Sequence, residues 1–363
     1  MRGKRRMKKY RKILINGNEL THETDGMTRV AFEVVRRLDR LLLPGQAEMV
    51  VKDRNDLRSL PRFQNIRIVE RKGPSVKWEF VYLDLYSMLT DSLELRFRNR
   101  AGHAKGIFYL HDVIPLSFYG EKPVCGRKDM TEAAGKAYHR NIKRMKRNAL
   151  AIVTVSDFSK AEIMRCLDVD GNRVAVIKNG WEHFRDIRPD MHIFERFRGL
   201  KEKQYFFSLG SISPHKNLGF IHELAKRYKS YDFVIAGRMN RGLQADVSDA
   251  DNLIFTGSLT DGEIKALMMN CKAFLFSSFI EGMGLPVLEA LSCGVEVCVS
   301  DIPVMHEYAG GSVHYFDPED AELDLESLVA EKVSAPEQAL DKLSWDKAAA
   351  DLYTLIKKYL KDS

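Results

Sequence analysis

The chain has 363 residues, of which 45% are hydrophobic and 29% are charged. This composition excludes wholesale disorder, and the length exceeds what one hydrophobic core usually holds, so we expect two domains of similar size. No apolar run approaches the ~20 residues that cross a bilayer, and no apolar segment follows the basic start. The sequence therefore predicts neither a membrane-spanning helix nor a secretory signal.

The formal net charge of +7 is concentrated at the start of the chain, where residues 1–12 hold eight Lys or Arg and no acid. Without this basic arm, 49 basic residues remain against 50 acidic residues. A nearly neutral body argues against nucleic-acid binding as the main function. The arm itself is predicted either to bind an anionic membrane surface or to be a solvated terminus.

Metal and disulfide chemistry find little support in the sequence. The five cysteines are odd in number and form no Cys-x-x-Cys pair, which favours reduced thiols in the cytoplasm. Two Asp-x-Asp strings, at residues 168–170 and 249–251, have the composition of turns rather than of metal loops. We therefore expect a cytoplasmic protein, peripheral on the inner face of the membrane if the arm binds lipid, that uses no metal ion or cofactor.

Short apolar runs alternate with helical patterns along the chain. In the first half the runs predict strands at 13–15, 49–51, 66–69, 107–110, 151–155 and 174–177. Helical patterns lie between them at 30–38 and in a basic stretch at 127–150. The alternation restarts after residue 200, with strands at 205–209, 233–236, 253–255, 273–276 and 295–299 and helices at 218–228 and 261–269. Each half is thus predicted to be a doubly wound parallel sheet, with ligands at the carboxyl ends of its strands.

Two further segments complete this organisation. Residues 179–199 carry no strand pattern and are expected to form the hinge between the halves. Residues 345–360 form one amphipathic helical pattern with lysines at its end.

The segment after the fourth strand of the second half carries the strongest chemical signal. It reads Ser-Ser-Phe-Ile-Glu-Gly-Met-Gly-Leu-Pro and continues into a helical pattern. Gly282 and Gly284 can take positive φ, and the amides near Leu285 would direct a helix dipole at a phosphate. Glu281 precedes the helix and Glu289 is expected in its first turn, so both carboxylates could bind hydroxyls of one ligand. Taken singly, either acid could instead be solvated or could stabilise the helix N-terminus.

The string Glu-Gly-Met-Gly-Leu-Pro-Val-Leu-Glu-Ala at 281–290 closely resembles the Glu-x7-Glu signature of glycosyltransferase family 4. The resemblance implies a retaining enzyme of the GT-B fold, which has two facing Rossmann-like α/β domains with parallel sheets. It implies a nucleotide-diphosphate sugar as donor, with Glu281 on the transferred sugar and Glu289 on the ribose. The residues expected around the donor are Gly282, Met283, Gly284 and Leu285.

Residues 207–218 again follow the order strand, turn and helix. Lys216, beside the helix start, offers a cation to a diphosphate, and Asn217 is a candidate helix cap. The segment is similar to the diphosphate-binding loop of the same family, in which many members carry Arg where this chain has Ser211. Arg238 is expected either to supply the missing charge or to form a surface ion pair.

In the first half, His111 follows a predicted strand at the edge where an α/β sheet binds ligands. An isolated His there is usually structural. The string His-Asp-Val-Ile-Pro at 111–115, however, is similar to one in bacterial polysaccharide transferases of the family, which implies that His111 contacts the donor sugar across the cleft. Gly26 would similarly let its loop approach the diphosphate. Weaker matches extend the resemblance over most of residues 13–318, at 24–29, 154–160, 179–180 and 305–307.

The predicted organisation is a basic arm at 1–12, an acceptor domain at 13–185, a nucleotide-sugar domain at 186–344 and a C-terminal helix at 345–363 that returns to the N-terminal domain. The resemblance to polysaccharide-assembly enzymes implies a glycan or lipid-linked oligosaccharide acceptor for capsule, exopolysaccharide or O-antigen. It suggests GDP-mannose or a rhamnose-type donor first. Basic residues at 136–147 predict a helix face that is either solvated or resting on anionic lipid.

Three other functions compete with transfer. A nucleotide-sugar epimerase or a sugar phosphorylase could use the same fold, and the Ser211 position leaves room for a non-catalytic member that binds nucleotide only. The presence of Glu281, Glu289 and Lys216 argues against the non-catalytic reading. A nicotinamide oxidoreductase is excluded, because no Gly-x-Gly-x-x-Gly follows the first strand.

Overall fold

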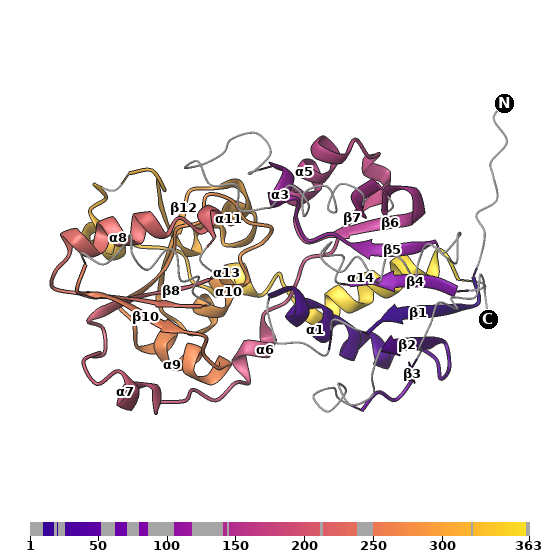
Figure 1. Ribbon diagram of the computed structural model, residues 1–363, viewed down its shortest axis with the longest axis horizontal. Coiled ribbons are helices and arrows are strands. Elements are labelled where there is room, and N and C mark those ends of the chain that lie inside the picture. Colours follow the sequence, from indigo (N-terminus) through magenta and orange to yellow (C-terminus); the bar gives the residue numbers. More distant parts are fainter. Residues whose placement is uncertain are drawn as a thin grey trace. The chain divides into compact units, whose positions relative to one another are not determined.

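The structure is a computed structural model, and the part of the chain that it describes divides into two compact units. Described residues up to Gly180 and those from Ser344 onward form the first unit, and those from Trp181 to Leu343 form the second (Figure 1). The described residues are 10–17, 20, 26–51, 62–70, 80–85, 105–117, 141–143, 145–210, 213–237, 250–320 and 322–360.

The first unit is built on a parallel sheet that is covered on both faces. Within the described residues it has seven strands, in the order β3-β2-β1-β4-β5-β6-β7. Strands such as β4 are buried along their whole length, as expected where helices lie on both sides of a parallel sheet. The strands are β1 (Lys12–Asn16), β2 (Ala47–Val51), β3 (Ile66–Glu70), β4 (Phe80–Asp84), β5 (Gly106–Tyr109), β6 (Ala149–Thr154) and β7 (Val174–Val176).

Four named helices of the first unit are α1 (Gly26–Leu41), α3 (Ile114–Ser117), α5 (Asp157–Leu167) and α14 (Trp345–Lys357). The amphipathic helix α1 buries one face, with Val30, Val34 and Leu38 at helical spacing. The C-terminal helix α14 packs against α1, and the bridge between Tyr10 and Leu360 joins both described ends of the chain within this unit.

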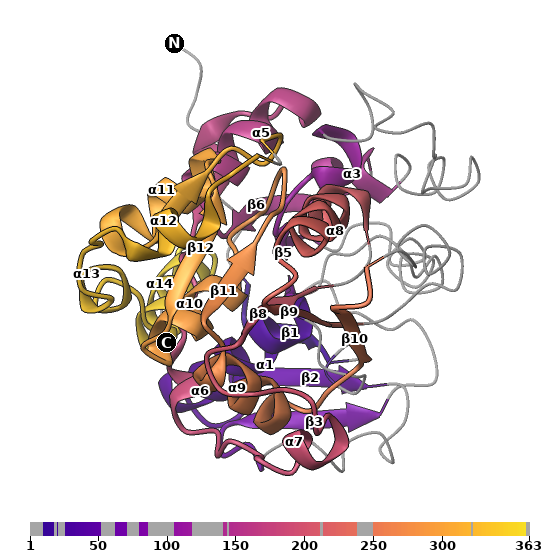
Figure 2. The ribbon, with the colours of Figure 1, turned by 90° about the vertical axis from the view of Figure 1, so that its left-hand side faces the viewer.

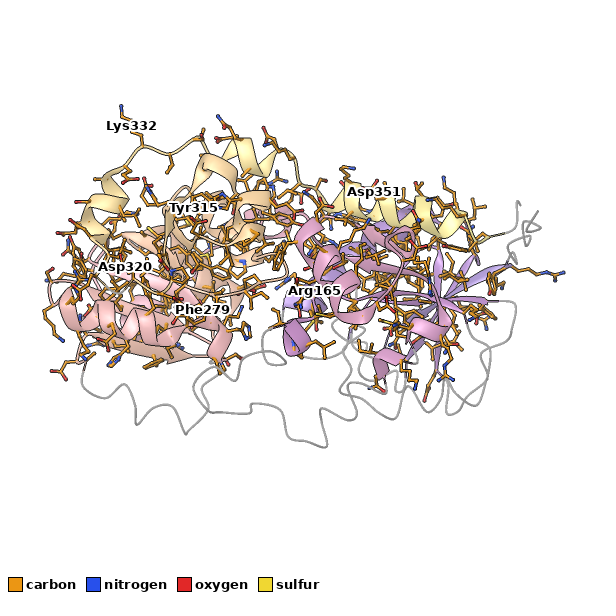
Figure 3. All side chains as sticks on the ribbon, turned by 90° about the horizontal axis from the view of Figure 1, so that it is seen from above. Arg165, Phe279, Tyr315, Asp320, Lys332 and Asp351 are labelled. Carbon is orange, nitrogen blue, oxygen red and sulfur yellow. The ribbon has the colours of Figure 1, made fainter. Side chains whose placement is uncertain are left out.

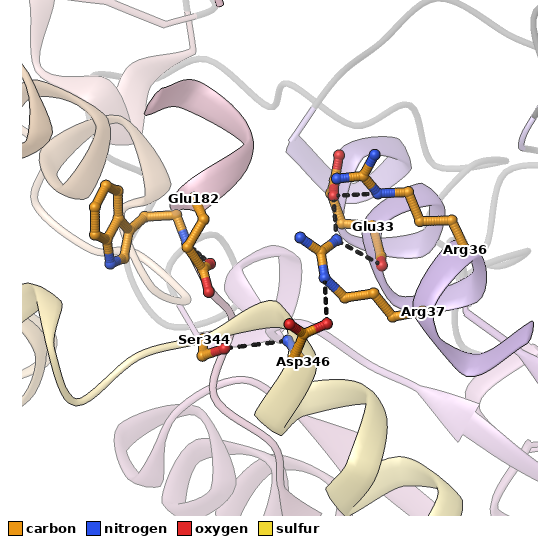
Figure 4. A network of polar contacts seen from close by, with 7 residues as sticks. Glu33, Arg36, Arg37, Glu182, Ser344 and Asp346 are labelled. Carbon is orange, nitrogen blue, oxygen red and sulfur yellow. Dashed lines mark hydrogen bonds and ion pairs between the residues drawn. The ribbon is translucent and has the colours of Figure 1, made fainter. Parts of the chain in front are cut away.

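A network of charged side chains fixes α14 to α1 (Figure 4). The buried carboxylate of Glu33 accepts from Arg37 and lies 2.8 Å from Nε of Arg36. Nε of Arg37 lies 2.9 Å from Oδ1 of Asp346, in the first turn of α14. The hydroxyl of Ser344 caps that turn by accepting from the Asp346 amide. The two arginines on its own helix compensate the burial of the Glu33 carboxylate. Arg37 also reaches Asp346 and so connects the two helices.

The second unit repeats the same architecture. Its described residues form a six-stranded parallel sheet in the order β10-β9-β8-β11-β12-β13. Stacked aromatic pairs fill its core, with ring centroids 5.2 Å apart for Phe206 and Phe233 and 4.8 Å apart for Phe220 and Phe316. The strands are β8 (Tyr205–Leu209), β9 (Asp232–Ala236), β10 (Leu253–Gly257), β11 (Ala273–Phe276), β12 (Glu296–Ser300) and β13 (His314–Phe316). The helices are α6 (Glu182–Arg185), α7 (Ile193–Arg196), α8 (Leu218–Arg227), α9 (Asp261–Asn270), α10 (Leu285–Ser292), α11 (Pro303–Tyr308), α12 (Leu325–Ala330) and α13 (Glu337–Leu340).

Most elements expected from the sequence are present, and three differences stand out. Strands β4 and β13 are additional to the predicted ones. The helix expected over 127–150 ends earlier, because Ala149 and Leu150 already belong to β6. Within that stretch 141–143 and 145–148 are helical, whereas 127–140 lie outside the described residues. Both Asp-x-Asp strings are turns where described, since Asp170 accepts from the Asn172 amide and Asp251 lies in a turn.

No helix among the described residues combines the length and the apolar character that crossing a membrane requires.

Candidate functional site

The order of strands in the second unit defines where a ligand would bind. From β8 the chain moves outward through β9 to β10, and from β11 it moves to the other side through β12 to β13. Strands β8 and β11 are neighbours at the centre (Figure 2), so the loops after them diverge from one point. Such a topological switch point is where doubly wound sheets bind their ligands.

The loop after β8 leads through a short 3-10 turn, Pro214–Lys216, into α8. Asn217 occupies the cap position of α8 with φ 52°, but its side chain does not cap the helix as the sequence suggested. Its Nδ2 instead donates to the Pro318 carbonyl, 2.8 Å away. The left-handed backbone at this position turns the chain sharply and leaves Lys216 directly before the helix.

The loops after β8 and β11 are tied together by hydrogen bonds to main-chain carbonyls of the first loop. The Phe279 amide donates to the His215 carbonyl at 2.8 Å, and the Ser277 hydroxyl donates to the Lys216 carbonyl at 3.0 Å. Figure 3 labels Phe279, in the loop that follows β11. Contacts on both sides of Lys216 therefore fix the backbone from which its side chain extends.

Lys216 and Glu281 meet at this point. Nζ of Lys216 donates to Oε1 of Glu281 at 2.6 Å and lies 5.4 Å from the centroid of the Phe276 ring. The two side chains are 24% and 10% exposed, so the pair is shielded from water yet still reachable. A shielded cation beside a carboxylate can bind an anionic ligand and leave the carboxylate to accept from hydroxyl groups.

His215, the neighbour of Lys216 in the sequence, is not a second cation at this site. Burial lowers the pKa of its imidazole from 6.5 to about 4, the charge of Lys216 acts in the same direction, and Glu281 opposes the shift. At neutral pH His215 is therefore uncharged, and the positive charge of the loop resides on Lys216.

The loop after β11 ends in a tight turn that starts α10. Of the two glycines singled out from the sequence, Gly284 has a positive φ, 89°, in the described structure and Gly282 does not. A Cβ on Gly284 would lie 2.6 Å from the end of the Met305 side chain, so only glycine fits without movement. Gly282, Met283 and Leu285 are buried around this turn. The first amides of α10 and its dipole are placed where the sequence predicted an anion site.

The position of Glu289 differs from the expectation. Because α10 already begins at Leu285, Glu289 is its fifth residue and lies in the second turn, not the first. Glu289 as a whole residue is 8% exposed. Oε1 of its carboxylate lies 3.1 Å from Nε2 of His183. No local sequence pattern marks His183, which lies three residues after the Asn179-Gly180 string.

A small, partly open pocket adjoins Lys216 in this unit. Its walls are apolar on the α8 side and polar beside the strand ends, where serine hydroxyls gather. The lining residues are Ser208, Leu209, Gly210, Lys216, Leu218, Ile221, Ile235, Phe276, Ser277 and Ser278. The pocket thus lies at the same switch point as the Lys216–Glu281 pair.

In the first unit, β5 ends at Tyr109, and His111 follows it after one residue, Leu110, at the predicted edge of the sheet. It is 8% exposed, and its Nε2 lies 3.2 Å from the Leu85 carbonyl beyond β4. Oδ1 of Asp112 accepts from the Ile114 amide and so starts α3. Gly26 is the first residue of α1 and is exposed. The proposed contacts of His111 and Gly26 with the donor stay predictions.

Several predicted residues lie outside the described residues, namely Ser211, Arg238, residues 1–9 of the basic arm, and residues 136–140 and 144 of the basic face. Of that face, Lys146 donates to the Leu167 carbonyl and is half-buried. Its charge is therefore engaged within the unit, which reduces the basic surface that this stretch could offer to lipid.

Comparison with known protein families agrees with a ligand site at the switch point of the second unit. Residues 192–332 match the family model described as "Glycosyl transferases group 1". The matched segment contains Lys216, Glu281 and Glu289. It covers the greater part of the second unit and therefore the whole switch point.

Two bacterial proteins show the similarity beyond the matched segment. The serotype-specific mannosyltransferase WbdA of Escherichia coli is 31% identical over 237 residues, which cover 60% of this chain and 28% of that protein. The O-antigen chain mannosyltransferase RfbU of Salmonella typhimurium is 28% identical over 246 residues, covering 63% of this chain and 65% of that protein. The similarity thus spans less than two thirds of the length of either relative.

The fold is shared more widely than the sequence. The structure of Anabaena Alr3699/HepE in complex with UDP and glucose matches with a TM-score of 0.69 at 14% identity, covering 96% of this chain and 100% of that one. Together with the two parallel-sheet units, this likeness confirms the α/β GT-B fold expected from the sequence.

Proposed function

We propose that this protein is a retaining glycosyltransferase that moves a hexose or deoxyhexose from a nucleotide-diphosphate sugar to a glycan acceptor in cell-surface polysaccharide biosynthesis. The observation that carries the proposal is the Lys216–Glu281 pair, which two separate loops bring to 2.6 Å at the switch point. The start of α10 lies in the same loop as Glu281 and offers a second site of positive potential. A diphosphate next to a sugar is a ligand that needs both features.

In the proposed reaction the diphosphate binds Lys216 and the first turn of α10. It competes with Glu281 for the lysine, so that the Glu281 carboxylate becomes available to hydroxyls of the sugar. When the bond between sugar and phosphate breaks, the negative charge that develops on the diphosphate is stabilised by the same two groups. Glu289 accepts from the ribose. Protein groups rather than a metal ion would supply this charge stabilisation.

Retention of anomeric configuration follows if the acceptor hydroxyl attacks from the face that the diphosphate leaves. In such a step the new bond to the acceptor oxygen forms as the bond to the phosphate oxygen breaks, and the leaving phosphate takes the hydroxyl proton. We assign no protein residue as general base.

The donor and acceptor are proposed from the relatives. WbdA and RfbU are named mannosyltransferases, and RfbU acts on the O-antigen chain. We therefore propose a mannosyl donor such as GDP-mannose and a lipid-linked oligosaccharide acceptor. The structure solved with UDP and glucose makes a uridine nucleotide the first competing donor. Contact of residues 1–12 with anionic lipid would bring the protein to such an acceptor.

Thermal unfolding with a panel of nucleotide sugars tests the donor. GDP-mannose, UDP-glucose, dTDP-rhamnose and ADP-glucose are compared, and a ligand at a hundred times its Kd adds about 2.7 kcal/mol of stability. We expect stabilisation by GDP-mannose, followed by transfer of labelled mannose to polyprenyl-diphosphate oligosaccharides with retention seen by NMR. Absence of stabilisation by every donor would refute the proposal. Conversion of donor alone into an altered sugar nucleotide would instead identify an epimerase.

A further inference from the structure

His183 occupies an unusual position for a buried histidine. It lies in the short helix α6, three residues after the chain leaves the first unit at Gly180. Its side chain is 3% exposed, and Nε2 lies 3.1 Å from Oε1 of Glu289, on α10. The contact joins residues that are 106 positions apart in the sequence.

The helix that carries His183 is firmly attached to the second unit. Nζ of Lys265, on α9, donates to the carbonyls of Phe184, Arg185 and Ile187 at 2.8–2.9 Å. This single ammonium group thereby adds a donor to the carbonyls at and after the end of α6, where few helical amides remain to pair with them.

A second attachment lies on the other side of His183. Nε1 of Trp181 donates to the Leu340 carbonyl on α13 at 3.0 Å, and both α6 and α13 pack against α10. The carboxylate of Glu182 accepts from the Trp181 amide at 3.0 Å (Figure 4). The backbone on either side of His183 is therefore held in place.

Glu289 depends on such a partner. A buried carboxylate needs hydrogen-bond donors, and a residue in the second turn of a helix is too far from the helix start to use its free amides. His183 supplies a donor to Oε1, which orients the carboxylate and directs Oε2 elsewhere. A binding group is most effective when neighbouring side chains hold it in the orientation that the ligand requires.

We propose that His183 is a positioning residue of the nucleotide site, acting through Glu289. It does not touch the ligand; it holds the Glu289 carboxylate ready for the ribose hydroxyls. This inference rests on the proposed function, in which Glu289 binds the ribose of the nucleotide.

Two substitutions at His183 separate hydrogen bonding from packing. In His183→Gln the side-chain amide nitrogen can replace Nε2 as donor, whereas in His183→Met the side chain fills similar space and donates nothing. A matched control is His314→Met, because His314 on β13 is also buried and its Nε2 lies 2.8 Å from Oε2 of Glu296. All variants are first checked for native circular dichroism and cooperative melting.

The measurement is calorimetric titration of the full chain with GDP, UDP, dTDP and ADP, the nucleotides of the four donors compared above, and it requires no acceptor. We expect His183→Met to raise the Kd of the nucleotide that binds by about tenfold, the effect of one hydrogen bond to a charged group. His183→Gln should stay within about threefold of the wild type, as should His314→Met. In transfer assays the donor KM should rise in His183→Met with kcat nearly unchanged, since binding to ribose is the same throughout the reaction.

Three results would overturn the inference. Equal Kd values for His183→Met and the wild type would show that the contact does not matter, and equal losses in His183→Met and His183→Gln would show that only packing matters. If the wild type binds none of the four nucleotides, the proposed function fails as well. Because the first two outcomes require a wild type that binds nucleotide, failure of the His183 inference and failure of the function can be told apart.

Discussion

The two sheets of this protein share a strand order and differ in what stands at the switch point. In the first unit, Asn16 and Asp84 end the adjacent strands β1 and β4, and Nδ2 of Asn16 donates to Oδ1 of Asp84 at 3.2 Å. They are 7% and 0% exposed. In the second unit, Lys216 and Glu281 lie in the loops beyond β8 and β11, and they are more accessible.

This difference shows how one topology can serve two purposes. A polar pair at the strand ends shares a hydrogen bond inside the core and contributes to stability. A charged pair carried beyond the strand ends by loops can exchange one partner for a ligand. We therefore expect substitutions at the first switch point to affect stability and those at the second to affect donor chemistry.

The largest expected effect is loss of transfer in Glu281→Gln. The variant keeps the shape of the side chain but removes the charge that the proposal places beside the sugar. Turnover should fall at least about 100-fold, which is typical when one electrostatic contact to the reacting group is lost. Affinity for the nucleoside diphosphate, as measured by titration, should not fall, because the diphosphate and the Glu281 carboxylate compete for Lys216. Turnover within a few-fold of the wild type would contradict the assignment.

The converse expectation applies to Asn16→Ala. Removing the amide takes one donor away from the fully buried carboxylate of Asp84, which should lower the free energy of unfolding by about 1–3 kcal/mol. The measurement is urea denaturation, with nucleotide titration alongside. The comparison fails if Asn16→Ala is as stable as the wild type, or if it abolishes nucleotide binding while the fold is intact.

A smaller effect on nucleotide binding is expected from substituting Gly284, which precedes α10. Gly294, which follows the other end of α10, serves as its control. Gly284 and Gly294 both have positive φ, at 89° and 68°, but only at Gly284 would a Cβ meet a neighbour, Met305. Each substitution by Ala should cost about 1–2 kcal/mol through backbone strain. Gly284→Ala should in addition weaken nucleotide binding by about tenfold, because it shifts the amides that face the phosphate. Equal nucleotide affinities in the two variants would argue against an anion site at the start of α10.

The smallest effect concerns pH. His215 has its pKa lowered to about 4 in the folded protein, mainly by burial, against 6.5 in the unfolded chain. Between these values the unfolded state binds more protons than the native state, so stability is lost as pH falls from 6.5 toward 4. The slope of the unfolding free energy against pH reflects the difference in bound protons between the unfolded and native states. Replacing His215 by Asn should reduce that difference in this window by up to about one proton. An unchanged slope would show that His215 titrates alike in both states.

The fold could be predicted largely from local patterns. Apolar runs bounded by turn residues gave eleven strands, including β1, β8 and β11, which surround the two switch points. Strand β4 was missed because its apolar residues continue on both sides without a turn signal. Strand β13 was missed because it has three residues and begins with a buried histidine.

The candidate site could be predicted only in part. The glycine turn and the resemblance pointed to Glu281, Lys216 and Glu289 as residues of one site. The helix register was wrong by part of a turn, since the positive φ of Gly284 starts α10 at Leu285. His183 was not found because its contact with Glu289 depends on how α6 packs on α10, which no local pattern encodes. A histidine three residues after the Asn179-Gly180 string was the available hint.

The most direct test of the central claim is calorimetric titration of Lys216→Ala with the nucleotide sugar that stabilises the wild type. Lys226→Ala is the matched control, because Lys226 lies on the adjacent helix α8 and pairs with Glu223 at the surface. We expect Lys216→Ala to raise the Kd at least about tenfold, because a charge-assisted contact to phosphate is lost, whereas Lys226→Ala should bind like the wild type. Wild-type affinity in a folded Lys216→Ala protein would contradict the placement of the diphosphate at this switch point.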